Sequence, residues 1–166
     1  INTATRTVTG NIPVGNEPIG IHINPVPFGW VTNRADNDVT IIRPNVFDAI
    51  GDVPAGVRTQ GVAGTLDSEV VVFSNRDSNT LTVHGTRTGV QRSVATGNNP
   101  IAVDVVQYES LPNQTVNRIN DLGSASALAY VANASENTVT VVDITPDPAT
   151  PGDFTAAAID TIAVGG

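Results

Sequence analysis

The segment VTNRADNDVTI at residues 31–41 decides the fold, because it recurs as FSNRDSNTLTV at residues 73–83 and as VANASENTVTV at residues 131–141. Each copy holds an asparagine, a second asparagine four residues later, and then a threonine between branched apolar residues. A repeat of this length fixes the architecture before any single residue is considered. We therefore interpret the whole chain as successive copies of one supersecondary unit.

Each copy predicts two strands joined by a tight turn. The β-branched runs on either side of the asparagine pair are typical of strands, and asparagine tolerates left-handed backbone and bonds its own main chain. A second phrase precedes the copies: IPVGNEPIGI at residues 12–21, VATGNNPIAV at residues 94–103 and a degenerate IGDVPAGV at residues 50–57. Its Gly-Asn before proline predicts a turn that leads into a buried strand. We assign a structural turn role to six asparagines: Asn33, Asn37, Asn75, Asn79, Asn133 and Asn137.

The spacing indicates an all-β fold built from β-propeller blades of four antiparallel strands. A period of roughly 40–45 residues is typical of such a blade. We place about three blades in one domain of residues 1–166, at residues 18–50, 55–95 and 101–164, preceded by an opening outer strand at 5–13. The third blade carries an insertion near 109–126. Three blades cannot close a ring, since propellers have about four to eight, so we expect a partial ring.

The repeat resembles that of the YVTN-family β-propellers. Trp30-Val31-Thr32-Asn33 and Tyr130-Val131-Ala132-Asn133 are similar to that family's Tyr-Val-Thr-Asn phrase, and the Ile-Pro-Val-Gly-Asn-x-Pro phrase at residues 12–18 is similar to its linker. The resemblance implies an exported protein of the surface-layer type, located in the periplasm, outside the cell or on the cell surface. A fold does not carry its function with it, so the ligand and the partner stay open.

Composition narrows the classes of partner. The net charge is −8, all eight basic residues are arginine, and no basic cluster exists, which disfavours nucleic acid and anionic membranes. No apolar run of about 18 residues predicts a membrane insertion. Cysteine is absent, which excludes disulfides, zinc thiolate sites and an attached c-type haem within these residues. The chain starts with Ile1 and holds no methionine, so we expect a processed or incomplete chain.

Candidate ligand contacts come from the strands expected to line the central channel. His22 lies four residues after Pro18, Asp104 four after Pro100, and Arg58 four after Pro54. If these positions are equivalent, the three side chains point into one channel, where an arginine and a carboxylate could anchor a small polar ligand. A structural ion pair or a hydrogen-bonded strand histidine is the alternative interpretation. The other imidazole, His84, precedes a glycine at a strand end and is expected to be exposed.

Two functions of different classes follow. Repeats without a nucleophile elbow, phosphate loop or Ser-x-x-Lys motif predict a non-catalytic scaffold for protein–protein interaction or surface assembly, with no catalytic residue, metal or cofactor. Its partners are the protein segments or chains that complete the propeller. The alternative is an accessory propeller segment of a larger redox or other enzyme whose active centre lies outside these residues.

Overall fold

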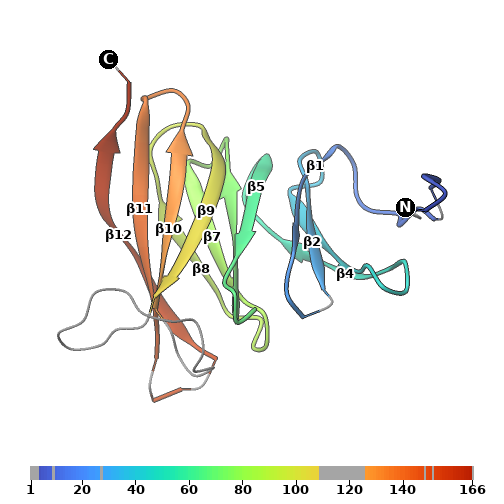
Figure 1. Cartoon of the computed structure of the whole chain (residues 1–166). Helices are drawn as coiled ribbons and strands as arrows, with labels where there is room; N and C mark the ends of the chain where they lie inside the picture. The colour runs from blue at the N-terminus through green and yellow to red at the C-terminus, as the bar shows by residue number, and fades with distance from the viewer. Residues whose placement is uncertain are drawn as a thin grey trace.

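Three four-stranded antiparallel sheets follow one another along the chain (Figure 1). The structure, a computed structural model, describes residues 4–8, 10–26, 28–108, 126–147, 149–150 and 152–165. In each sheet the strands keep their order in the sequence, from β1 to β4, from β5 to β8 and from β9 to β12. The expected insertion near 109–126 lies almost wholly outside the described residues. The all-β fold class and the four-stranded blades are confirmed.

The strand bounds follow the repeat. The first sheet, blade 1, consists of β1 (Pro18–Ile23), β2 (Gly29–Asn33), β3 (Asp38–Arg43) and β4 (Asp48–Pro54). Blade 2 consists of β5 (Thr59–Gly64), β6 (Val70–Asn75), β7 (Thr80–Gly85) and β8 (Gln91–Ala95). Blade 3 consists of β9 (Pro100–Tyr108), β10 (Ser126–Asn133), β11 (Thr138–Pro146) and β12 (Phe154–Ala163).

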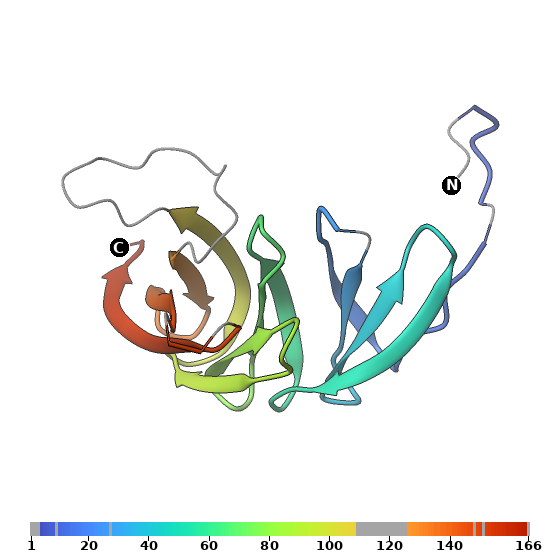
Figure 2. The ribbon, with the colours of Figure 1, turned by 90° about the horizontal axis from the view of Figure 1, so that it is seen from below.

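The blades fan out around one open side, with the first strand of each blade nearest to that side (Figure 2). Strand β5 contacts β1 on one flank and β9 on the other, so the three inner strands are neighbours. Strands β4, β8 and β12 form the outer rim (Figure 2). The sheets do not close on themselves, as expected for a partial ring.

The opening strand expected at residues 5–13 is wrong. Residues 4–6 form a turn, Thr7 makes a single bridge, and the other described residues of this stretch belong to no strand. The physical reason is the lack of a partner: a strand persists only beside an edge that accepts its hydrogen bonds, and the three inner strands of its blade do not occur in this chain.

The apolar core lies in the two seams between blades. Trp30, Val39, Val71 and Phe73 fill the seam between blades 1 and 2. The seam between blades 2 and 3 is larger and contains, among others, Val72, Leu81, Val131, Val142 and Ile144. Strand β6 of blade 2 thus presents Val71 and Phe73 to blade 1 and Val72 to blade 3. Consecutive blades are held together by burial of these faces.

Candidate functional site

The first asparagine of each repeat is a buried structural residue. Asn33, Asn75 and Asn133 end the second strand of their blades and are at most 2% exposed. The Nδ2 of Asn75 donates to Thr80 Oγ1 at 3.1 Å and to Thr82 Oγ1 at 2.9 Å. The amides of Asn33 and Asn133 make the same pair of contacts to residues five and seven positions later. These side chains stabilise the hairpin between the second and third strands. Both Nδ2 hydrogens are used within the hairpin, so the amide nitrogen has no donor left for a ligand.

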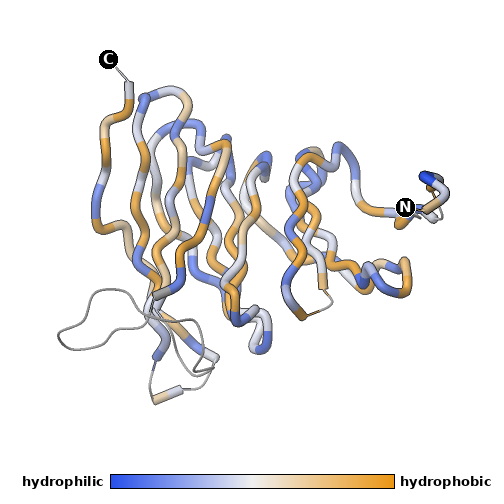
Figure 3. The backbone as a smooth tube through the Cα atoms, in the orientation of Figure 1, coloured by the Kyte–Doolittle hydropathy of each residue, from blue (hydrophilic) through white to orange (hydrophobic). Residues whose placement is uncertain are grey.

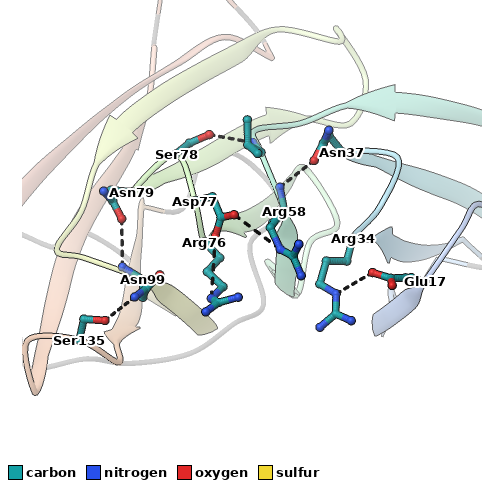
Figure 4. Close-up of polar contacts among 11 residues, drawn as sticks. Glu17, Arg34, Asn37, Arg58, Arg76, Asp77, Ser78, Asn79, Asn99 and Ser135 are labelled. Carbon is teal, nitrogen blue, oxygen red and sulfur yellow. Dashed lines mark hydrogen bonds and ion pairs between the residues drawn. The ribbon is translucent and has the colours of Figure 1, made fainter.

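The second asparagine of the repeat connects neighbouring blades. Asn37, Asn79 and Asn137 all have a left-handed backbone, with φ of 60°, 54° and 52°. The Oδ1 of Asn37 accepts the main-chain N–H of Arg58 in blade 2 at 2.7 Å, and that of Asn79 accepts the N–H of Asn99 in blade 3 at 3.0 Å (Figure 4). We call this contact the seam clip. One hydrogen bond thus fixes the position of each blade relative to the next along the direction of the strands.

Arg58 does not lie on an inner strand. It precedes β5 in a left-handed conformation, with φ of 55°, and its Nε lies 3.6 Å from an Asp77 carboxylate oxygen at the surface (Figure 4). The count from Pro54 failed because Pro54 ends β4, where it pairs with Asp38, and does not begin the next blade. Thr59 occupies the position of the missing proline. The expected channel trio is therefore incomplete.

His22 and Asp104 do occupy equivalent inner-strand positions. His22 pairs with Trp30 and Asp104 with Tyr130, and these partners are equivalent in the repeat. In blade 2 the matching residue is Ala63, which pairs with Val72. Burial lowers the pKa of His22, while the nearby charge of Asp104 acts in the opposite direction. Among the described residues, no three His, Cys, Asp or Glu side chains gather to hold a metal ion.

His84 is buried rather than exposed, contrary to the sequence-based expectation. It is 6% exposed, and its ring centroid lies 5.4 Å from that of Trp30, in an edge-to-face arrangement, and 6.3 Å from that of Phe73. Burial lowers the pKa of this imidazole, so the neutral form is favoured. The prediction assumed that the strand ends at His84, before Gly85. Strand β7 in fact includes Gly85, whose N–H donates to the carbonyl of Val90.

The outward faces of blades 1 and 3 are covered only in part. Gly20 and His22 of β1 face blade 2, so the alternating Ile21 and Ile23 point the other way, and they are 63% and 49% exposed. On blade 3, Val139 is half-buried, whereas Val39 at the same repeat position is fully buried. Hydrophobic stretches run along the strands of both end blades as they do in the middle blade (Figure 3).

Similar solved structures support the fold, whereas the other two comparisons found no match. No model of a known protein family matches the sequence, and no curated protein matches it. A β-propeller domain of Cps50 (Swd1) from Myceliophteria thermophila is similar in structure, with a TM-score of 0.52 and 9% identity over 82% of this chain and 54% of that one. Hydrazine synthase from Kuenenia stuttgartiensis has a TM-score of 0.51 and 13% identity over 95% of this chain and 53% of that one.

A third similar structure is a candidate 6-phosphogluconolactonase from Bacteroides fragilis. Its TM-score is 0.58 and its identity is 20%, over 90% of this chain and 40% of that chain. The chain thus spans about half of the length of the solved structures it matches. At these identities the likeness shows the fold alone. The chain has the β-propeller fold, with three blades arranged around an open side.

No membrane-spanning helix is found among the described residues.

The arginines are dispersed over the surface. Six of the described arginines each form an ion pair with a nearby carboxylate, such as Arg34 with Glu17 at 3.0 Å (Figure 4) and Arg92 with Asp153 at 2.9 Å. Arg6 is the exception, since no described carboxylate pairs with it. Exposed pairs of this kind contribute little to stability.

Proposed function

We propose that this chain is a non-catalytic β-propeller scaffold whose end blades bind the protein segments or chains that complete the propeller. The observation that carries the proposal is the difference between inner and outer blade faces. Val39 and Leu81 are fully buried in the two seams, whereas Val139 at the same repeat position is only half-buried on the outward face of blade 3. On blade 1, Ile21 is 63% exposed, whereas the equivalent Val62 and Val103 are partly buried in the seams. Apolar side chains exposed together on one face can mark an interaction surface.

The seam clip supports the same proposal at blade 3. Asn137 repeats the residue type, position and left-handed backbone of Asn37 and Asn79. Its side chain is exposed, and no described residue donates to its Oδ1, whereas Asn37 and Asn79 are half-buried by the blade that follows. An acceptor with this geometry fits a main-chain N–H of a further blade. The partner is therefore a protein surface that repeats the entry turn of blades 2 and 3.

The cellular setting is part of the proposal and rests on the resemblance to YVTN-family repeats. That resemblance favours an exported scaffold in the periplasm, outside the cell or in a surface assembly. The acidic composition, with a net charge of −8, is compatible with a soluble surface in such a setting. Detection of the protein in the exported fraction of its source organism would test this point separately from the interaction.

Accessibility of a single thiol tests the interaction. Because the chain has no cysteine, Val139→Cys on the blade 3 face can be compared with Ser93→Cys, which is exposed on the outer strand β8. When each variant is expressed in the source organism and isolated in its native assembly, we expect the thiol at 139 to react at least about tenfold more slowly than in the isolated chain. The thiol at 93 should react equally fast in both. Equal reactivity at 139 in both preparations would overturn the proposal.

A second candidate is an accessory propeller segment of a larger redox or other enzyme whose active centre lies outside these residues. Two of the similar structures bear enzyme names, a hydrazine synthase and a candidate 6-phosphogluconolactonase, which motivates this candidate. Metal analysis and a visible spectrum of the intact native protein distinguish the two. Stoichiometric metal or haem favours the accessory role, and their absence together with protection at residue 139 favours the scaffold.

A further inference from the structure

A cavity of about 290 Å³ opens between blades 1 and 2, at the opposite end of the strands from the seam clips. Blade 1 contributes Asn24, Phe28 and Trp30 from the β1–β2 connection and β2, and blade 2 contributes Asp67 and Ser68 from the β5–β6 turn. The two walls come from different copies of the repeat. The cavity therefore exists only where two blades meet.

Three residues that line this cavity each carry a buried polar atom with no hydrogen-bond partner among the described residues: Asn24 Oδ1, Trp30 Nε1 and Ser68 Oγ. These residues are 5%, 3% and 8% exposed. Buried polar groups are almost always paired, because an unpaired one costs about 1–3 kcal/mol. Eight such atoms occur among the described residues, and three of them belong to residues that line this one cavity, which points to a guest that pairs with them.

The chemistry of the lining selects the guest. The indole Nε1 can only donate, the hydroxyl of Ser68 can donate or accept, and Asn24 offers an amide oxygen. Apolar walls are supplied by Phe28, Ile41 and others. The charges at the rim have opposite sign: Arg87 pairs with Glu69 at 2.7 Å, and Asp67 bonds to Thr65 Oγ1 at 2.6 Å. The site therefore favours no net charge on its guest.

The volume of the cavity limits the class of guest molecule further. Ligand pockets usually measure about 300–1,000 Å³, so this cavity is at the small end. A compact guest with hydroxyl or amide groups on its edge and C–H groups on its faces fits both the polar atoms and the apolar walls. A single pyranose ring has these properties.

We propose that the cavity between blades 1 and 2 binds a small neutral sugar, a single pyranose ring, through Asn24, Trp30 and Ser68. The ring of His84 packs edge-to-face with Trp30 from behind, at 5.4 Å between centroids, and holds the indole in place. This inference does not depend on a partner at the end blades, because both walls of the cavity lie within this chain.

Trp30 is the single tryptophan of the chain, so its fluorescence and its indole N–H resonance report on the cavity directly. The probes are glucose, galactose, mannose and N-acetylglucosamine, each titrated into the chain. We expect a saturable change of both signals with at least one of these sugars. Loss of one hydrogen bond should weaken binding about tenfold, in Asn24→Leu and in Ser68→Gly.

Ser68 has a φ of 63°, so glycine removes its hydroxyl without straining the backbone. Ser93→Ala is the matched control, since it removes a hydroxyl from the outer strand, in the lining of a different cavity of about 370 Å³, and should bind as the parent does. If Asn24→Leu fails to fold by circular dichroism, Ser68→Gly decides alone. The proposal is overturned if no sugar gives a saturable change, if the pocket variants bind like Ser93→Ala, or if a soaked crystal shows only water there.

Discussion

Replacing the same valine in two blades measures what a neighbouring blade contributes. Val39 and Val139 occupy one repeat position, but Val39 is 0% exposed in the seam between blades 1 and 2, whereas Val139 is half-buried on the outward face of blade 3. Each Val→Ala change removes two methyl groups. Because the chemical change is identical, the difference in the free energy of unfolding reports the covering blade alone.

The magnitude follows from burial. Two buried methyl groups are worth about 1.6 kcal/mol of transfer free energy at ~0.8 kcal/mol each, and the cavity left behind adds to this. We therefore expect Val39→Ala to destabilise the chain by about 2–3 kcal/mol. Val139→Ala should cost less than about 1 kcal/mol, since part of its side chain already meets water.

Urea denaturation followed by circular dichroism checks both values, with an unchanged m-value as the condition for comparing midpoints. In thermal unfolding the Val39 variant should melt about 5–10 °C lower, at roughly 2–4 °C per kcal/mol for a chain of this size. Equal destabilisation by the two substitutions in the isolated chain would refute the reasoning. A cost at Val139 that rises to the Val39 value in the native protein would support a covering partner.

Other predictions concern the seam clip, the hairpin and pH. Asn79→Gly keeps the left-handed backbone but leaves the N–H of Asn99 without its acceptor, so we expect a loss of about 1–2 kcal/mol by urea denaturation, whereas Asn137→Gly should be nearly neutral. Equal effects would contradict the clip. Asn75→Ala should cost about 2–4 kcal/mol in the same assay, because it empties a fully buried position and unpairs two threonine hydroxyls. Burial lowers the pKa of His84, so the unfolded chain binds the proton more readily and stability should fall as the pH drops below about 6.5. Melting temperatures between about pH 7 and 5 should fall less steeply in His84→Gln, and an unchanged slope would contradict this.

The repeat made most of the fold predictable, because blade position is set by residues that recur. The asparagine pairs and the branched runs around them placed the hairpins, and an uncovered end face follows from having three blades. The opening strand was predicted wrongly because the repeat encodes a strand but not the neighbour that it needs. The strands that it needs as partners are not found among residues 1–166, and apart from the bridge at Thr7 the described residues of 5–13 belong to no sheet.

The candidate site was less predictable, because it depends on contacts between blades. Arg58 was placed wrongly because the count began at Pro54, which ends β4. Blade 2 has Thr59 at the position where the other two inner strands have proline. The burial of His84 could have been suspected from the alternation of β7, but its contact with Trp30 crosses a seam. No pattern in the sequence announces the cavity, since its walls come from segments about forty residues apart that do not share a motif.

The seam clip also gives the blade array a direction. Blade 2 presents the Asn79 acceptor to blade 3 and the Arg58 main-chain donor to blade 1, so its two faces are complementary rather than alike. Copies of the chain that join through this contact would therefore join head to tail, which yields a closed ring if the rotation per contact completes a circle and an open helical filament if it does not.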